Sequence, residues 1–416
     1  MNTQLKKKMA DIGAKTKVCF RVVFADGSSW QNHERPPEVT ITIRNSRAAW
    51  RVLLFGHVGF LEAYFNGDID VEGNFPLMFR AGMDAGFDGR PTFLVALRNW
   101  WHELRFSNGS IAQAKANARF HYGPGQDFYR EWLDQVGMAY TCSWFVGGAK
   151  TLEDAQRAKM DHVCRKVLLK PGDTFADIGS GWGNLLFYAW ENYGAYGTGI
   201  NTTTEQVQET RAEIKRRGLE GKVEVLERDF REVPRQFDKL LSIGTLEHAG
   251  RDQLGEVIQA HANYLKPGGL GVIHFIGHVG VRDTEFWIRK YIFPGGWIPS
   301  LAQAIDWCER CGLEVVDIEN LRRNYALTLD DWALRFDRNW EKVHQLDPMR
   351  FDEKFRRIWR TYLWSCAEMF RSPNGRTHLF QIVVSKGNVG DNYPMSRAFL
   401  YESTRGKAHP SARSAA

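Results

Sequence analysis

The feature that most constrains the fold of this chain is a glycine-rich turn between an apolar run and a helical segment, DTFADIGSGWGNLLFYAW. The apolar run predicts a strand that ends at Asp177, the turn passes through Gly179, Gly181 and Gly183, and a helix is expected from about Asn184. Glycines let a backbone approach a ligand closely, and helix N-terminal amides with a carboxylate can hold polar groups. The segment therefore predicts a nucleotide-cradling loop.

The spacing of these glycines bears on the kind of nucleotide. A dinucleotide fold favours G-x-G-x-x-G followed by an acid about twenty residues later. This loop is G-x-G-x-G, and the next expected strand ends in GTGINTTTEQ without that acid. NAD is therefore disfavoured, and a nucleoside that carries an amino acid fits the arrangement.

From about Lys170 onward, the sequence alternates between strand-like runs and amphipathic helical segments. FDKLLSIGTLEHAG predicts a strand that ends in a carboxylate and an imidazole, and YLKPGGLGVIHFIG predicts a helix, a turn and a further strand. Such alternation is typical of a doubly wound parallel sheet. Ligands of these sheets bind at the carboxyl ends of the strands, which is where Glu247 is expected.

A chain of 416 residues exceeds what one hydrophobic core usually supports, so two domains are expected. Short segments with the alternating pattern of strands, an Asp-Gly turn, and a following segment with a helical pattern predict an N-terminal α+β domain over residues 1–106. The polar stretch 107–118 is interpreted as a linker, residues 119–405 as the catalytic domain, and residues 406–416 as a mobile tail.

Composition limits the class of protein. Hydrophobic residues make up 43% and charged residues 25%, which is ordinary for a globular protein, and no apolar run reaches the length of a spanning helix. The six cysteines are scattered, so a reducing cytoplasm is expected, and Cys308 and Cys311 are interpreted as helix packing rather than a metal site. The net charge of +6 suits an anionic surface, and no nucleic-acid motif is present.

The segment from Lys159 to His278 resembles class I AdoMet methyltransferases. Its flanks, HYGPGQDFYREWLDQVGMAYTCSWF before the loop and RKYIFPGGWIPSL and NYALTLDDW after it, resemble the cyclopropane-fatty-acid synthases and mycolic acid cyclopropane synthases. The resemblance implies an α/β fold, the class I methyltransferase (Rossmann-like) doubly wound sheet with a smaller N-terminal α+β domain. It also implies S-adenosyl-L-methionine as cofactor and the cis double bond of an unsaturated phospholipid acyl chain as substrate.

An alkene is a poor nucleophile, so the reacting carbons must be held in line in a dry pocket, and a base must remove a proton for a ring to close. In the resembled family that base is a bound bicarbonate. The positions that match its ligands are Cys142, Glu247, His274, the backbone amide of Ile276, and Tyr325. His274 is expected at a strand end and Tyr325 in a loop, where each has the alternative of being a satisfied polar group of the core.

For AdoMet, the resemblance implies a larger set of residues around the predicted loop. Gln206 is expected to hold the ribose hydroxyls, because the second strand ends without the usual acid, and Phe230 is either a wall for the adenine or part of the core. The full set is Tyr140, Thr141, Asp177, Gly179, Gly181, Gly183, Asn201, Thr202, Gln206, Asp229 and Phe230.

Several alternatives stay open at this point. Departures from the family pattern, such as Ser180 in place of a frequent Cys and Asn324 in place of a frequent His, leave open whether the product is a cyclopropane or a methyl-branched lipid. A methyltransferase of soluble amines and a silent lipid-binding relative are the other classes. The N-terminal domain is expected to help hold the lipid or only to pack. The protein is expected to be cytoplasmic and peripheral to the inner face of the membrane, and the resemblance offers a homodimer because the family includes dimers.

Overall fold

The computed structural model describes residues 2–86, 92–232 and 235–401, so the predicted tail over 406–416 lies outside the described residues. Two compact units divide the chain, and each is assembled from three separate segments. The first unit consists of Met1–Leu133, His278–Ile298 and Tyr325–His378; the second consists of Asp134–Gly277, Pro299–Asn324 and Leu379–Ala416.

The second unit is built on a seven-stranded sheet with the order β10-β11-β9-β8-β5-β6-β7. Strand β5 pairs in parallel with β6 and β8, β6 with β7, and β8 with β9, whereas β10 pairs antiparallel with β11. Strand order reverses at β5, which has β6 on one side and β8 on the other. The predicted doubly wound α/β fold is confirmed. The strands are β5 (Thr174–Ile178), β6 (Tyr196–Asn201), β7 (Val223–Glu227), β8 (Phe237–Ile243), β9 (Leu265–His278), β10 (Leu313–Asn320) and β11 (Thr377–Lys386).

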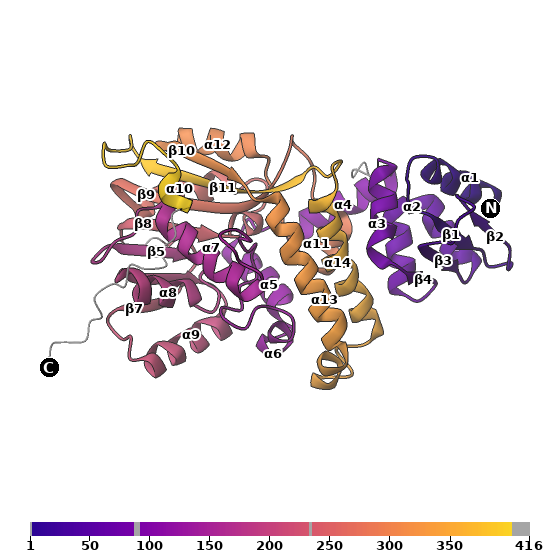
Figure 1. Cartoon of the computed structure of the whole chain (residues 1–416), viewed down its shortest axis with the longest axis horizontal. Helices are drawn as coiled ribbons and strands as arrows, with labels where there is room; N and C mark the ends of the chain where they lie inside the picture. The colour runs from indigo at the N-terminus through magenta and orange to yellow at the C-terminus, as the bar shows by residue number, and fades with distance from the viewer. Residues whose placement is uncertain (1, 87–91, 233–234, 402–416) are drawn as a thin grey trace. The chain divides into compact units, whose positions relative to one another are not determined.

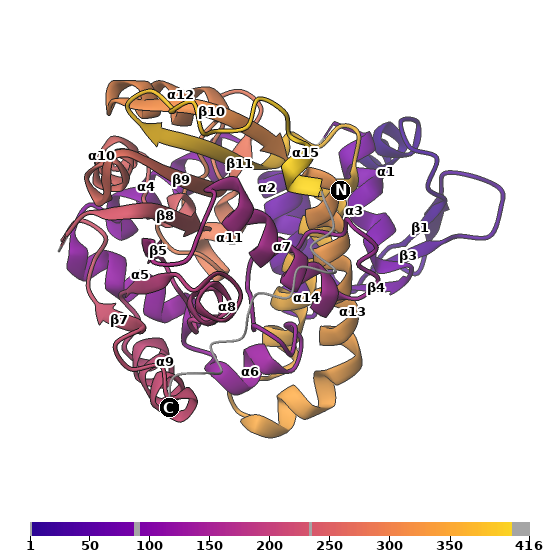
Figure 2. The same ribbon diagram turned by 60° about the vertical axis from the view of Figure 1, so that its left-hand side comes forward.

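Helices of the second unit bury the apolar residues of this sheet. Helix α8 contacts β6, α9 contacts β6 and β7, α10 contacts β8, and α12 lies against both α10 and β10 (Figure 1, Figure 2). Strand residues such as Phe175 and Val272 are fully buried with helix residues such as Val163 and Leu186 in one core. The helices are α7 (Leu152–Lys166), α8 (Asn184–Tyr193), α9 (Thr204–Arg217), the short 3-10 helix η1 (Leu246–His248), α10 (Leu254–Tyr264), α12 (Leu301–Arg310) and α15 (Ala398–Tyr401).

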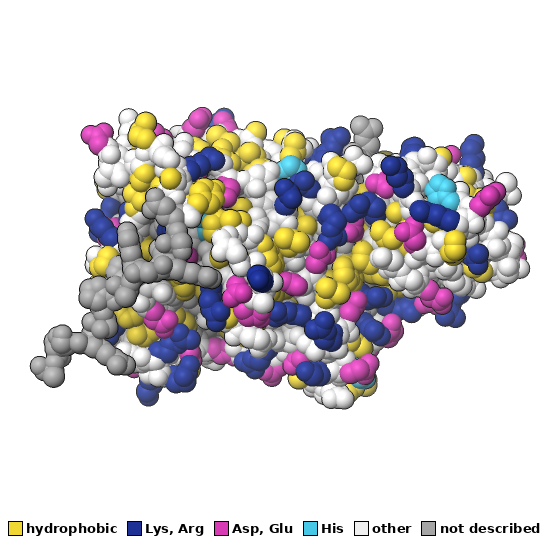
Figure 3. Space-filling model, viewed as in Figure 1, with side chains coloured by type: hydrophobic (Ala, Val, Ile, Leu, Met, Phe, Trp, Pro, Cys, Tyr) yellow, Lys and Arg dark blue, Asp and Glu magenta, His cyan; other side chains and the backbone are white. Residues whose placement is uncertain are grey.

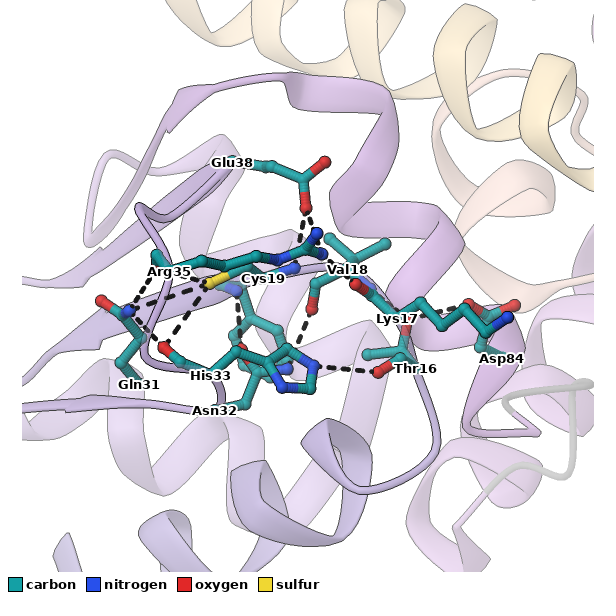
Figure 4. A network of polar contacts seen from close by, with 11 residues as sticks. Thr16, Lys17, Val18, Cys19, Gln31, Asn32, His33, Arg35, Glu38 and Asp84 are labelled. Atoms are coloured by element: carbon teal, nitrogen blue, oxygen red, sulfur yellow. Dashed lines mark hydrogen bonds and ion pairs between the residues drawn. The ribbon is translucent and has the colours of Figure 1, made fainter.

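The first unit contains a smaller sheet with the order β2-β1-β3-β4. The alternating pattern of residues near the N-terminus predicts strands in this part of the chain. The strands of the sheet are β1 (Phe20–Val23), β2 (Ser29–Gln31), β3 (Val39–Ile43) and β4 (Ile69–Gly73). Polar contacts anchor the segment before β1 (Figure 4): the side chain of Asn32 bonds to the backbone of Val18 and of Phe20, and the Cys19 N–H donates to Glu38 at 2.9 Å. These contacts satisfy one another, so we assign them a structural role.

Helices make up the rest of the first unit, and Arg357 shows how distant segments join in it. This arginine donates to the backbone carbonyls of Tyr64 and Ile69 and forms an ion pair with Asp70 at 2.7 Å. The helices are α1 (Asn2–Gly13), α2 (Ser46–Phe65), α3 (Phe75–Asp84), α4 (Phe93–Phe106), α5 (Ile111–Tyr122), α6 (Gln126–Arg130), α11 (Phe286–Tyr291), α13 (Arg322–Leu346) and α14 (Glu353–Arg371).

The compact units divide the chain differently from the single boundary expected at 107–118. Most of that stretch is helix α5, which begins after Ser110, whose hydroxyl accepts the Gln113 N–H at 3.2 Å. Asn117 in this helix is buried and bonds to Asn108 at 2.6 Å. The polar residues that led to the linker interpretation therefore cap and anchor a helix.

On the face shown in Figure 3, basic and acidic side chains are interspersed, and neither sign of charge forms a large patch of its own. Across the described residues, no helix is both long enough and apolar enough to span a bilayer.

Candidate active site

The glycine loop joins β5 to α8 with three left-handed residues: Gly179, Gly181 and Gly183 have φ of 78°, 53° and 80°. A Cβ on Gly179 would lie 2.8 Å from Oγ1 of Thr245, and one on Gly183 would lie 2.6 Å from Cγ2 of Thr210. A Cβ on Gly181 would meet nothing within 4 Å. The first and third glycines are thus required by close packing, whereas the second leaves open space beside the loop.

Asp177 lies one residue before the end of β5 and is buried. Burial raises the pKa of its carboxyl to about 7, although the nearby Lys159 ammonium acts to lower it. Lys159 projects from α7, is itself buried, and donates from Nζ to Oγ1 of Thr141 at 2.9 Å. The buried ammonium group of Lys159 therefore interacts with both segments: it donates a hydrogen bond to Thr141, and its charge acts on Asp177 in β5.

The segment that contains Tyr140, Thr141 and Cys142 has no regular secondary structure, and Asp134 holds it in place. The buried carboxylate of Asp134 accepts hydrogen bonds from three backbone N–H groups, those of Val136, Gly137 and Ala139. From α7, the amide of Gln156 donates to the carbonyl of Thr141 at 2.9 Å. A Cβ on Gly244, directly after β8, would lie 3.2 Å from Cγ2 of Thr141, so this segment lies beside the end of β8.

Asn201 at the end of β6 connects the glycine loop to α9. Its amide nitrogen lies 3.0 Å from the carbonyl oxygen of Gly181 and 3.0 Å from Oε1 of Gln206. Its Oδ1 accepts the N–H of Thr203, which leaves Thr202 in the intervening turn. The bond to Asn201 uses the Gln206 oxygen, so the Gln206 amide nitrogen is the group that can donate to a ribose hydroxyl.

Asp229 and Phe230 come shortly after β7, and the carboxylate of Asp229 is bound by a neighbouring arginine. Arg231 binds both of its oxygens, with Nε at 2.6 Å from Oδ1 and a terminal nitrogen at 2.9 Å from Oδ2. The Arg231 guanidinium also lies over the ring of Phe230, at 5.2 Å from the centroid. Phe230 is half-buried, so it is not an interior core residue.

Glu247 lies in η1, four residues after the end of β8, and is half-buried. Its Oε1 accepts the backbone N–H of Ile276 at 2.6 Å, while Oε2 is buried with no hydrogen-bond partner among the residues described. Burial raises the pKa of this carboxyl to about 7. The Ile276 amide, which the resemblance assigns to the anion, thus bonds to Glu247 in this structure.

His274 is buried and lies inside β9, four residues before its end, so the expectation that it lies at a strand end is wrong. It pairs with Ile243, the last residue of the shorter neighbouring strand β8. Its Nδ1 lies 3.0 Å from the side-chain nitrogen of Gln381 on β11, and its Nε2 is buried without a partner in the described part of the chain. Burial, with smaller effects from the charges of Lys159 and Lys166, holds the pKa of this imidazole well below its usual range. His274 is therefore neutral.

Cys142 and Tyr325 complete the predicted anion ligands. Cys142 is fully buried in the second unit, and its thiol donates to the carbonyl of Ser143 at 3.1 Å. Tyr325 belongs to the first unit, where its ring packs against Phe370 with centroids 4.6 Å apart. The expectation that Tyr325 lies in a loop is wrong, because it lies in the first turn of α13.

Within the second unit, the predicted residues gather at one edge of the sheet. Asp177, Glu247 and His274 follow or lie near the carboxyl ends of the adjacent parallel strands β5, β8 and β9. Within the described ranges, one polar atom of Glu247 and one of His274 have no hydrogen-bond partner, and a Cβ on Gly181 would meet nothing within 4 Å. This edge can hold a nucleoside ligand beside a small polar group.

Sequence reasoning missed the residues that support this edge, chiefly Asp134, Gln156 and Lys159. A signal for two of them was available in α7, where Gln156, Lys159, Val163 and Lys166 follow one another at helical spacing. All four are buried. Polar residues at core positions of a helix indicate interior partners.

Comparisons with known proteins agree with this architecture. A family model described as mycolic acid cyclopropane synthetase matches residues 110–382. The chain is 38% identical over 294 residues to a "probable fatty acid methyltransferase" of Pseudomonas putida, covering 68% of this chain and 72% of that protein. It is 32% identical over 350 residues to the cyclopropane-fatty-acyl-phospholipid synthase of Escherichia coli K12, covering 83% and 88% respectively.

Among solved structures, the mycolic acid cyclopropane synthase CmaA1 in complex with SAH and CTAB superposes with a TM-score of 0.60 at 28% identity. The match covers 65% of this chain and 98% of CmaA1. Since the family model also spans more than half of the sequence, this chain is an enzyme that belongs to the mycolic acid cyclopropane synthetase family and has the class I methyltransferase fold.

Proposed function

We propose that this enzyme transfers a methyl group from AdoMet to the cis double bond of an unsaturated phospholipid acyl chain, with bicarbonate as the base and a cyclopropane as the product. The observation that carries the proposal is that two buried atoms, Glu247 Oε2 and His274 Nε2, have no hydrogen-bond partner in the part of the chain that the structure describes. Glu247 follows β8, and His274 lies beside the last residue of that strand. An unsatisfied buried polar atom costs about 1–3 kcal/mol, so two of them at a ligand edge favour a polar ligand.

AdoMet fits the chain's own residues at the loop. The space beside Gly181 is open, and the buried hydroxyl of Ser180 has no partner among the described residues. Gln206 can donate to the ribose, and Asp177 lies at the strand end that precedes the loop. The other groups proposed to hold the cofactor are the predicted ones, Tyr140, Thr141, Gly179, Gly183, Asn201, Thr202, Asp229 and Phe230.

Bicarbonate fits the two unpartnered atoms because it carries both a donor and acceptors. Its hydroxyl can donate to Glu247 Oε2, and one of its oxygens can accept from His274 Nε2, which carries the proton when Nδ1 accepts from Gln381. Cys142 and Tyr325 are proposed as further ligands. The Ile276 amide holds Glu247 in place through the bond described above.

When bound, AdoMet would supply an electrophilic methyl group, and bicarbonate would supply a base. The chain's part is to orient and to exclude water. His274 and Cys142 are buried, and Glu247 is half-buried with its Oε2 atom buried, so few water molecules can reach these groups. With a pKa near 7, Glu247 can hold or release a proton at Oε2 near neutral pH.

Product analysis tests this function. Purified protein is incubated with AdoMet and vesicles of anionic unsaturated phospholipid, and the acyl chains are analysed by mass spectrometry. We expect each modified chain to gain one methylene and to resist catalytic hydrogenation, because a cyclopropane has no alkene. A product of the same mass that takes up hydrogen would be a methyl-branched alkene, consistent with the name of the Pseudomonas relative. Unchanged acyl masses with turnover of an amine would contradict the proposal.

Helix α4 supports a peripheral association with the membrane, which this substrate requires. Six apolar side chains lie exposed along its 14 residues: Phe93, Leu94, Leu97, Trp100, Trp101 and Leu104. Val95 and Asn99 on its other side are buried. A helix whose apolar and aromatic residues face outward suits the interface of a bilayer, and the net charge of +6 favours anionic lipid. We therefore propose that this face of α4 docks on phospholipid.

Removing the two indoles tests the docking face. We expect the double variant Trp100→Ser/Trp101→Ser to bind anionic vesicles at least about tenfold more weakly by co-sedimentation, because two large apolar groups are lost. Met349→Ser, at an exposed methionine outside α4, is the control and should bind as wild type does. If the indoles instead contact a second copy of the chain, the variant would change mass in sedimentation velocity while binding vesicles normally, which would contradict the docking proposal.

A further inference from the structure

Behind His274, a row of buried and half-buried polar side chains continues from Gln381 through the second unit, and its members beyond Gln381 have no part in the chemistry proposed so far. Gln381 Oε1 accepts from Nζ of Lys166 at 2.7 Å, and Lys166 also pairs with Glu319 at 2.6 Å. Glu319 in turn bonds to Nε2 of His162 at 2.7 Å. Lys166 and Gln381 are fully buried, which is costly for an ammonium group unless it is paired.

The direction of the hydrogen bonds along this row is fixed by one residue. An ammonium group only donates, so the atom of Gln381 that faces Lys166 must be its oxygen. The other end of the same amide, which faces His274 Nδ1 at 3.0 Å, is then the NH₂ group, which only donates. Nδ1 of His274 must therefore be the unprotonated nitrogen.

The tautomer of His274 follows from this chain of donors. A neutral imidazole with a bare Nδ1 carries its proton on Nε2, and Nε2 is the buried nitrogen that lacks a partner among the residues described. The ring thus presents an N–H donor at the strand ends, and the opposite tautomer would present a lone pair that repels an anion.

We propose that Lys166 and Gln381 are positioning residues that hold His274 as the Nε2–H tautomer and so make it a donor to an anion. This inference rests on the proposed function for the identity of the anion, but the tautomer itself does not. Glu319 completes the set by balancing the charge of Lys166, and His162, stacked on Trp144 with centroids 4.0 Å apart, orients Glu319.

The variant that tests the proposal best is Gln381→Glu, which keeps the shape of the side chain. A carboxylate only accepts, so His274 would move its proton to Nδ1, and Nε2 would become an acceptor. Selective ¹⁵N labelling of histidine, with the His274 signals assigned by loss in His274→Gln, reads the tautomer directly in the full-length protein. We expect the Nε2–H form in wild type, the Nδ1–H form in Gln381→Glu, and a mixture in Lys166→Met, where the amide is free to turn over.

Lipid turnover provides the second measurement. We expect kcat of Gln381→Glu to fall about 10- to 100-fold while the KM for AdoMet stays within about twofold, because a donor to the anion is lost and the cofactor loop is not touched. The control is Ser385→Ala, a buried change on the same strand that leaves the row intact, and it should alter neither the tautomer nor kcat by more than about twofold.

Several results would overturn the proposal. An Nδ1–H signal in wild type, an unchanged tautomer in Gln381→Glu, or a reversed tautomer with unchanged kcat would each do so. Failure of the proposed function is distinguishable from these, because a wild-type protein that modifies no lipid still reports its His274 tautomer by NMR.

Discussion

Glu247→Gln is expected to lower lipid turnover at least about 100-fold while leaving AdoMet affinity within about twofold. The amide oxygen of the variant can still accept the Ile276 N–H, so the local backbone should keep its place. The amide cannot hold a proton at the position of Oε2, and that is the atom proposed to face the anion. Single-turnover kinetics and calorimetric titration with AdoMet separate the two effects.

The same variant has a predicted effect on stability whose sign depends on pH. The pKa of Glu247 is about 7 in the folded protein against 4.5 for an ordinary glutamate, so the folded state binds its proton more tightly. That contribution is fully present below pH 4.5 and is lost as the pH rises through 7. Without bound anion, Glu247→Gln should therefore equal wild type near pH 4 and exceed it by about 1–3 kcal/mol in free energy of unfolding at pH 8.

Glu220→Gln is the matched control, since Glu220 is exposed in the turn before β7. It should show wild-type turnover and the wild-type dependence of stability on pH. A Glu247→Gln protein that lost AdoMet binding and turnover to the same extent would contradict the role given to Glu247, because the damage would then lie in the cofactor site.

Gly183→Ala is expected to lower the free energy of unfolding by about 2–4 kcal/mol and to weaken AdoMet binding at least about tenfold. Two causes add: a non-glycine residue is strained at a φ of 80°, and its Cβ would lie 2.6 Å from Cγ2 of Thr210. Since Gly183 is the residue before α8, any shift moves the N-terminal amides of that helix. Urea unfolding measures the first effect and calorimetry the second.

Two further variants separate strain from collision. Gly218 also has a positive φ, 64°, but a Cβ there meets nothing within 4 Å, so Gly218→Ala should cost only about 1 kcal/mol. Thr210→Ser removes Cγ2 and keeps the hydroxyl that bonds to the Gln206 carbonyl, so it should recover part of the loss in the double variant with Gly183→Ala. Equal losses at Gly183 and Gly218, with no recovery, would show that packing against Thr210 is unimportant.

How much of this site could be predicted depended on how local each signal is. The strand, turn and helix around Asp177 and Gly183 are consecutive in the chain. Their residue types follow from the local backbone conformation, since the turn needs glycines at positive φ, and such a pattern can be recognised in the sequence alone. The α/β fold followed from the alternation of such local patterns. The expectation of a loop at Tyr325 overlooks the spacing of Tyr325, Leu329, Trp332 and Phe336, which is that of a buried helical face.

The supporting contacts were beyond prediction because they join distant segments. Gln381 and His274 are 107 residues apart, and Gln381 and Lys166 are 215 apart. A polar residue in an apolar strand signals that a partner exists, but only the packed sheet shows which residue it is. The ion pair between Asp229 and Arg231 is not predictable for a different reason: the two are close in sequence, yet a long arginine side chain has many possible orientations.

The interleaving of the two compact units limits how this enzyme can be dissected. Because six segments alternate between the units, the polypeptide passes from one to the other five times. A fragment that begins at residue 119 would retain α14 but lose the strand and helix ends that Arg357 binds at Tyr64 and Ile69, along with the helices α2 and α3 that α14 packs on. Such a fragment would expose apolar helix faces and aggregate, so functional dissection of this enzyme calls for point substitutions in the intact polypeptide rather than truncation.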